Sequence, residues 1–278
     1  MQYQRIIESD RDRWLMVTSI LRRNNVNVLG NGSQTLIFAH GFGTDQTAWR
    51  HQIPAFVDRY RIVLFDHVGA GKSDFAAYSP RRYSSLYSYA EDLLDICAEL
   101  KLQQCILVGH SVSGMVSLLA ALAEPQYFRK LIFVGASPRY LNDVDYVGGF
   151  EQADLDALYA AMATNYYAWA SGFAPLVMGN PDKPELAIEY ANTLSAIRPD
   201  IAQAVARVIF QSDHRAELPR LKTPVDILQS NNDIAVPLEV GKYMAAKIPN
   251  SRLINIPATG HLPHLSAPEA VTHAISCA

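Results

Sequence analysis

The sequence predicts an α/β fold in which a mostly parallel sheet is covered by helices on both faces. Short apolar runs rich in Val, Ile, Leu and Phe recur along the chain, each bounded by turn residues. Unbroken runs of this kind are typical of strands buried on both faces. Segments with helical periodicity lie between them, and such alternation favours a parallel sheet. The 278 residues, 49% of them hydrophobic, are enough to bury a large core without disulfides.

The apolar runs and the periodic segments give the expected elements in chain order. Asn31-Gly32 predicts a hairpin between the first two strands, so the sheet is expected to begin antiparallel. Seven strands are expected at residues 27–30, 35–40, 61–66, 105–110, 130–135, 225–230 and 252–257. The clearest helices are expected at residues 86–100, 112–123, 238–248 and 268–276.

The alternation of strands and helices is interrupted between about residues 140 and 210. This stretch is rich in Ala, Tyr, Phe and Trp, and Pro175, Pro181, Pro184 and Pro199 divide it into short helical segments. An all-helical insertion in an α/β sheet is typical of a lid. We therefore expect a core formed by residues 25–139 and 211–278, a helical lid at 140–210, and an N-terminal extension at 1–24.

Composition excludes several classes of function. The 24 basic and 27 acidic residues give a net charge of −3 without a long basic run, so we expect no binding to nucleic acid or to a membrane surface. The three cysteines, Cys97, Cys105 and Cys277, are odd in number and lack metal-site spacing. With no signal-peptide pattern at the N-terminus, a cytoplasmic location is expected. We also expect a monomer with no cofactor and no metal.

The most informative segment is Gly109-His-Ser-Val-Ser-Gly114, which follows a buried strand and opens a helix. A strand–turn–helix context of this kind is typical of a nucleophile elbow, with Ser111 at its tip. Small residues are needed two positions either side of the nucleophile, and Gly109 and Ser113 meet this need, although glycine is the usual second residue. The alternative is an ordinary serine that caps a helix.

A serine nucleophile needs a base and an orienting carboxylate, which follow it in the chain order acid, then histidine. Asp233 and His261 each follow a later strand, where parallel sheets gather their sites. We predict that His261 takes the proton of Ser111 and that Asp233 orients the imidazole. A turn aspartate and a surface histidine are the alternatives. His264 is the rival base, but His261 comes directly after Gly260 and is preferred; a metal pair of the two histidines is disfavoured by Pro263 and by the lack of further ligands.

Donors for an oxyanion are expected after the strand at 35–40. Gly41-Phe42-Gly43 places the backbone N–H of Phe42 as one donor, and the N–H of Val112 is the other. The glycine-rich segment 68–73 contains Gly71-Lys72-Ser73 but has Asp66 where a phosphate-binding loop requires glycine. That segment is expected to be a structural turn behind the sheet.

Several longer segments carry a more specific signal than the elbow alone. They are HGFGTDQTAW (40–49), GHSVS (109–113), SPRYLNDVDYVGGFEQ (137–152), NYYAWASGFAPL (165–176), RPDIA (198–202), FQSDHR (210–215) and GHLPHLSAP (260–268). Together these segments resemble one branch of the α/β-hydrolase family, the bacterial RsbQ proteins and the plant karrikin and strigolactone receptors. The plant receptors share the GHSVS variant of the elbow.

The resemblance implies an eight-stranded core sheet, a V-shaped lid of four helices and the triad Ser111, Asp233 and His261. It also implies an aromatic substrate pocket beneath the lid. The residues themselves favour another explanation, since aromatics at such places more often form the core of the lid than the wall of a ligand pocket. The pocket positions that match the family are Phe42, Tyr140, Phe150, Trp169, Phe173 and Phe210.

Two functions follow from these expectations. The first is a serine hydrolase of small hydrophobic esters or butenolide-type lactones, with slow turnover coupled to ligand sensing. The second is a signalling protein with weak or no catalysis, which binds a small ligand and presents its lid to a protein partner. One triad can serve both.

Overall fold

The computed structural model describes residues 19–277, which form one mixed sheet with helices around it. Within this range the sheet has seven strands in the spatial order β1-β3-β2-β4-β5-β6-β7. All neighbours run parallel except β1, which is antiparallel to β3. The strands are β1 (Asn27–Leu29), β2 (Gln34–Ala39), β3 (Tyr60–Phe65), β4 (Cys105–His110), β5 (Phe128–Val134), β6 (Val225–Asn232) and β7 (Ser251–Thr259).

The predicted α/β class is confirmed, and two details of the sheet are corrected. The eight strands implied by the family resemblance are wrong for residues 19–277, because the segment before β1 forms helix α2 (Ile20–Arg23) and adds no strand to that edge. The predicted hairpin is also wrong, since β1 pairs with β3 and not with β2. The chain at Gly32 passes so close to the start of β3 that an added Cβ would lie 2.1 Å from the carbonyl oxygen of Arg59.

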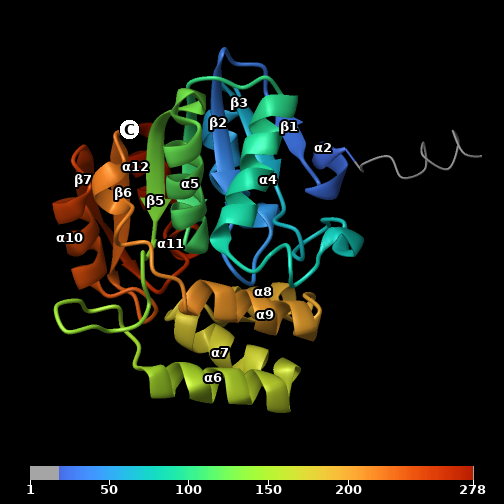
Figure 1. Cartoon of the computed structure of the whole chain (residues 1–278), viewed down its shortest axis with the longest axis vertical. Helices are drawn as coiled ribbons and strands as arrows, with labels where there is room; N and C mark the ends of the chain where they lie inside the picture. Colours follow the sequence, from blue (N-terminus) through green and yellow to red (C-terminus); the bar gives the residue numbers. More distant parts are fainter. Residues whose placement is uncertain (1–18, 278) are drawn as a thin grey trace, which may run out of the picture.

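Helices cover both faces of the sheet, as Figure 1 shows. Alternate strand residues divide between two cores. Ile37 and Leu107 pack in the larger core, while their neighbours Phe38 and Val108 pack in the smaller one. This alternation explains why the central strands β2 to β5 are apolar along most of their length. The expectation of burial on both faces is wrong for the two edge strands, since β1 is exposed and β7 is largely exposed or half-buried. The core helices are α3 (Ile53–Phe56), α4 (Leu86–Glu99), α5 (Val112–Ala123), α10 (Leu238–Lys247), α11 (Pro263–Ser266) and α12 (Pro268–Ser276), with 3₁₀ turns η1 (Gln46–Trp49), η2 (Phe75–Ala77), η3 (Pro125–Tyr127) and η4 (Leu218–Arg220).

Four helices are inserted between β5 and β6 and stack below the carboxyl ends of the strands (Figure 1). Pro184 and Pro199 occupy first positions of their helices, where the missing N–H costs nothing. The backbone N–H of His261 donates to the carbonyl of Val177 at 2.9 Å, which ties this lid to the end of β7. The lid helices are α6 (Gln152–Thr164), α7 (Tyr166–Met178), α8 (Pro184–Ser195) and α9 (Pro199–Phe210).

The predicted extension at 1–24 is described only from residue 19 onward. Those last residues are bound to the core: Arg23 pairs with the buried carboxylate of Asp92, and the side chain of Asn24 donates to the carbonyl of Asp66. Residues 1–18 lie outside the described part of the chain. Among residues 19–277 no helix has the length and apolar character needed to cross a membrane.

Candidate active site

Ser111 lies at a sharp turn between β4 and α5. Its backbone has φ 55° and ψ −122°, a conformation that non-glycine residues rarely adopt and that is found at functional sites. The turn brings strand and helix so close that a Cβ on Gly109 would lie 2.5 Å from the carbonyl oxygen of Ser113. The predicted strand–turn–helix arrangement is therefore present, and it holds the hydroxyl of Ser111 at the end of the strand.

The structure brings Ser111, His261 and Asp233 together from the carboxyl ends of β4, β7 and β6. Oγ of Ser111 lies 2.8 Å from Nε2 of His261, and Nδ1 of His261 lies 2.8 Å from Oδ2 of Asp233. An ionised carboxylate only accepts, so Nδ1 carries the proton and Nε2 is free to accept from the hydroxyl of Ser111. All three side chains are nearly inaccessible to solvent. A chain of hydrogen bonds in this order can move a proton from the hydroxyl to the imidazole.

His264, the rival base, lies elsewhere. Its ring is completely buried in α11, stacked on Trp49 at 4.5 Å and 4.4 Å from the ring of His110. Neither of its ring nitrogens has a hydrogen-bond partner among residues 19–277. Burial lowers the pKa of His264 to about 3. His264 is thus a buried packing residue beside the site, and His261 alone of the two contacts Ser111.

The two expected oxyanion donors flank Ser111 on separate segments. Val112 is the first residue of α5, where the backbone N–H has no partner within the helix. Phe42 follows β2, and Tyr190 of the lid donates its hydroxyl to the Phe42 carbonyl at 3.3 Å. In the described part of the chain neither the N–H of Phe42 nor that of Val112 has a hydrogen-bond partner. The assignment of these two N–H groups to an oxyanion hole stays a prediction.

The six expected pocket aromatics fall into separate groups. Tyr140, Phe150 and Phe210 cluster together, with ring centroids of Tyr140 and Phe210 5.0 Å apart. The hydroxyl of Tyr140 lies 3.3 Å from Oγ of Ser111, and because that oxygen uses its own proton toward His261, Tyr140 is the donor. Trp169 stacks on Phe173 at 4.9 Å within α7. Their role as a substrate pocket also stays a prediction.

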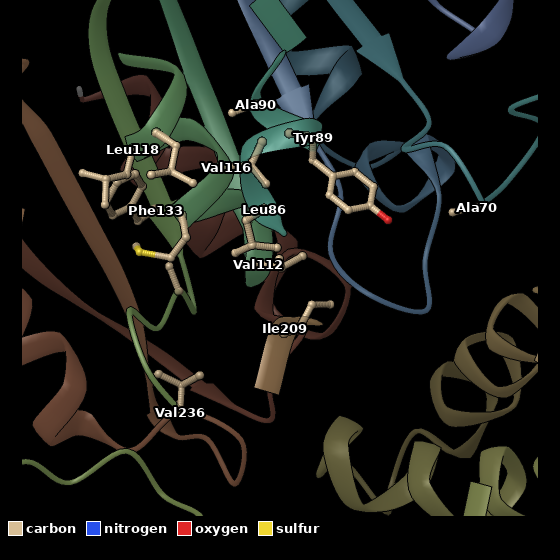
Figure 2. Packing of buried hydrophobic residues seen from close by; sticks show 14 of the residues in the cluster. Ala70, Leu86, Tyr89, Ala90, Val112, Val116, Leu118, Phe133, Ile209 and Val236 are labelled. Carbon is tan, nitrogen blue, oxygen red and sulfur yellow. The ribbon is translucent and has the colours of Figure 1, made fainter. Parts of the chain in front are cut away.

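A cavity of about 40 Å³ lies against Phe42 and Val112. Its lining includes Leu86 and Tyr89 of α4, Val112 of α5 and Ile209 of the lid. Figure 2 shows Leu86 and Val112 next to each other, with Ile209 nearby. The loop after β3, expected as a turn behind the sheet, instead lies at the carboxyl end and lines this cavity through residues 67–70. Of the six expected pocket residues, only Phe42 is part of this wall.

Sequence reasoning missed a second polar network beside the elbow. Ser113 donates to the carbonyl of His40, and Nε2 of His67 lies 2.7 Å from the same Ser113 oxygen. This network explains why serine replaces the usual glycine, since its hydroxyl joins the loops after β2 and β3. It is not a second nucleophile and base, because Ser113 is fully buried and Nδ1 of His67 meets no carboxylate among the described residues. The position of His67, just after a strand end, was the available signal.

Neither His261 nor His264 is arranged as a metal ligand. His261 uses both ring nitrogens toward Ser111 and Asp233, and His264 faces Trp49 and His110. Within residues 19–277 no three His, Cys, Asp or Glu side chains are grouped so that they could hold a metal ion.

Comparisons with known proteins agree with this architecture. The chain is 50% identical over 250 residues to Karrikin insensitive 2 receptor CA of Petunia hybrida, covering 89% of this chain and 92% of the relative. It is 44% identical over 265 residues to Strigolactone esterase RMS3 of Pisum sativum, covering 95% and 99%. The solved structure of a hydrolase from Oleispira antarctica matches with a TM-score of 0.91 and 39% identity over 93% of this chain and 95% of that one. A family model described as the alpha/beta hydrolase fold matches residues 34–268, and the chain belongs to this α/β-hydrolase family.

Proposed function

We propose that this protein is a serine hydrolase of small hydrophobic esters or butenolide-type lactones, with slow turnover coupled to ligand sensing. Ser111 is the nucleophile, His261 the general base and Asp233 the orienting carboxylate. The observation that carries the proposal is the unbroken pair of 2.8 Å hydrogen bonds from Ser111 through His261 to Asp233. The strained backbone of Ser111 supports the same role.

The reaction proceeds by acyl transfer through the enzyme. Oγ of Ser111 bonds to the carbonyl carbon while Nε2 of His261 takes its proton, and the N–H groups of Phe42 and Val112 hold the resulting oxyanion. Collapse of this intermediate breaks the ester bond, and the leaving oxygen takes the proton from His261. Water, activated by His261, then releases the acid from Ser111.

The substrate class is proposed from the chemistry of the cavity and from the relatives. The walls next to Phe42 and Val112 are mostly aliphatic, which favours a small apolar ligand over a charged one. Two relatives at 44% and 43% identity are named strigolactone esterases, and others at 50% and 46% are named Karrikin insensitive 2 receptors. A receptor role in such relatives is compatible with slow hydrolysis in this chain.

The first experiment replaces the nucleophile. We expect Ser111→Ala to lower the hydrolysis of p-nitrophenyl acetate by at least about 10³-fold. Ser276→Ala, an exposed serine at the end of α12, is the matched control and is expected to keep wild-type activity. Equal rates for wild type and Ser111→Ala would refute the assignment. Mass spectrometry of wild-type protein during turnover should locate the acyl group on Ser111.

A second function is favoured by exposed apolar residues: a signalling protein with weak or no catalysis, which binds a small ligand and a protein partner through its lid. Tyr167, Leu176 and Ile188 on α7 and α8 are 58%, 62% and 60% exposed, and exposed apolar groups of this size are common where partner proteins bind. For a signalling protein, we expect the double variant Leu176→Ser with Ile188→Ser to keep the esterase activity of wild type. The same variant should lose the protein partner that wild type captures in a pull-down. Fast turnover of a metabolite with no protein captured by the lid would favour plain catalysis.

A further inference from the structure

We propose that the C-terminal end of the lid helix α7 positions the general base, and that Asn180 is the positioning residue that fastens this helix end to the loop of His261. The proposal rests on the proposed function, because it concerns how His261 is kept within reach of Ser111. It gives the lid a part in the reaction beyond covering the site.

The loop that carries the base also caps the lid helix. The last four carbonyl groups of a helix have no partner within the helix. The carbonyl of Val177, in the last turn of α7, accepts the backbone N–H of His261 at 2.9 Å. Both residues are buried, so if α7 moved away the two groups would lose their partners where water does not replace them. The position of the base and the position of the lid are therefore linked through one peptide group.

Asn180 joins the same helix end to the end of β7. Its Nδ2 donates to the carbonyl of Met178 at 2.6 Å and to the carbonyl of Thr259 at 2.8 Å. An amide NH₂ group has two protons, so one side chain can satisfy a carbonyl on each segment. Gly179 ends α7 in the left-handed conformation, with φ 65°, and turns the chain directly before Asn180. Because Thr259 precedes Gly260 and the base in the chain, this bridge lies next to the base.

The two backbones are in direct contact between these hydrogen bonds. A Cβ on Gly260 would lie 1.8 Å from the carbonyl oxygen of Met178, and a Cβ on Gly179 would lie 3.2 Å from Cα of Gly260. Gly260 has φ 92°, a conformation that favours glycine. A shift of the end of α7 is thus transmitted to the residue directly before His261.

The core holds the opposite side of the same loop. A carbonyl only accepts, so Nε2 of His110 carries a proton and donates it to the carbonyl of His261 at 2.8 Å. The backbone N–H of Gly260 donates to the carbonyl of Asn232, directly before Asp233, at 2.7 Å. The base is held between a core support and a lid support, and Asn180 is the side chain that secures the lid support.

The kinetic test replaces the donor by an acceptor of the same shape. In Asn180→Asp the ionised carboxylate only accepts and is repelled by both carbonyls. We expect kcat for p-nitrophenyl acetate to fall by about 10–100-fold with KM close to the wild-type value, because a small misplacement of a catalytic group costs this much. Asn192→Asp is the matched control, since it adds the same charge at an exposed asparagine of α8 and should keep wild-type kcat. An unchanged kcat in Asn180→Asp would overturn the proposal.

A second variant separates positioning from folding. Asn180→Ala removes the same two hydrogen bonds without adding a charge, and we expect it to lower kcat by about tenfold. Melting temperatures identify a variant that is unfolded at the assay temperature. If Asn180→Asp does not fold, Asn180→Ala decides the question, and wild-type kcat in Asn180→Ala would then refute the positioning role.

A measurement that needs no hydrolysis separates this proposal from the hydrolytic one. The proton that Nδ1 of His261 donates to Asp233 should give a downfield proton NMR resonance in wild type, in Ser111→Ala and in Asn192→Asp. We expect Asn180→Asp to broaden this resonance or to abolish it, because the displaced base exchanges its proton with water. A fall in kcat with an unchanged resonance would also overturn the proposal, since the base would not have moved.

The combined outcomes assign a failure to one of the two proposals. If hydrolysis persists in Ser111→Ala while the resonance depends on Asn180, only the nucleophile assignment fails. If hydrolysis depends on Ser111 while kcat and the resonance are the same in Asn180→Asp and wild type, only the positioning role fails.

Discussion

Asp233 divides its carboxylate between His261 and the backbone: Oδ2 lies 2.8 Å from Nδ1 of His261, while Oδ1 accepts the N–H groups of Ala235 and Val236. These backbone bonds fix the direction in which the second oxygen faces. The carboxylate therefore determines which nitrogen of His261 is protonated.

Replacing Asp233 by asparagine should reverse that proton placement. The amide oxygen would keep the bonds to Ala235 and Val236, so its NH₂ group would face Nδ1 of His261 and force the proton onto Nε2. Nε2 then no longer accepts from Ser111, and we expect kcat for p-nitrophenyl acetate to fall about 10⁴-fold in Asp233→Asn. The melting temperature should change little. A loss of less than about tenfold would contradict the assigned role.

Stability should fall in mild acid because of buried neutral histidines. The folded-state pKa of His264 is about 3, against an ordinary value of 6.5, so below pH 6.5 the unfolded chain binds a proton that the folded protein excludes. The free energy of unfolding should therefore decrease as pH falls, by about 2 kcal/mol at pH 5 from His264 alone. The lowered pKa values of His67 and His110 act in the same direction.

Urea denaturation between pH 7 and pH 5 measures this effect. His264→Phe keeps a ring that can stack on Trp49 but removes the titrating group. We expect the difference in unfolding free energy between the two pH values to shrink by about 2 kcal/mol in this variant. The same pH dependence in His264→Phe and wild type would show that His264 does not contribute.

A pair of glycine substitutions tests the close approach at the elbow. A Cβ at Gly109 would lie 2.5 Å from a backbone oxygen, so Gly109→Ala should lower the free energy of unfolding by about 1–3 kcal/mol and impair hydrolysis. Gly172 lies in α7 with nothing within 4 Å of an added Cβ, and Gly172→Ala should stabilise the protein by roughly 0.5–1 kcal/mol. Thermal unfolding of both variants measures the two changes in stability. An unfolding free energy of Gly109→Ala equal to that of wild type would contradict the close approach of strand and helix at the elbow.

Asp92 should be important for the attachment of the segment around Arg23. Its buried carboxylate bonds to Arg23, Arg82 and the hydroxyl of Tyr83. Arg82 is 40% exposed and Arg23 also lies 3.7 Å from Asp95, so neither arginine is left as a buried unpaired charge. Asp92→Asn should therefore lower the free energy of unfolding by about 1–3 kcal/mol, the cost of the lost charge-assisted hydrogen bonds. Denaturant titration of Asp92→Asn, Arg23→Gln and the double variant would measure the coupling. Additive effects would show that the two side chains act independently.

The sequence was most informative where the signal was local. A buried strand, a small-residue turn and a helix are adjacent in sequence around Ser111, and α5 begins and ends at the predicted residues, Val112 and Ala123. Asp233 and His261 were found because each follows a strand, and parallel strands bring their carboxyl ends to one edge. The same rule applies to His67, whose position after β3 was overlooked.

Features that depend on packing partners were not predictable in the same way. Asn31-Gly32 indicates only that the chain can turn at this point. The pairing of β1 with β3 also depends on the close contact between Gly32 and the backbone of Arg59, which the sequence does not show. The cavity beside Phe42 and Val112 is lined by the loops after β2 and β3 and by residues of α4, α5 and α9. The hydrophobic periodicity of one segment does not show which other segments it will contact in the folded protein.

The four lid helices occupy the connection between β5 and β6, which are neighbours in the sheet. A single crossover helix would be enough to connect these two parallel strands. The order of the strands in the sheet therefore does not depend on the number or length of the lid helices. We expect this segment to be exchangeable as one module among relatives. New ligand preferences could then be acquired by recombination of a single stretch of chain while the reactive groups on the sheet stay in place.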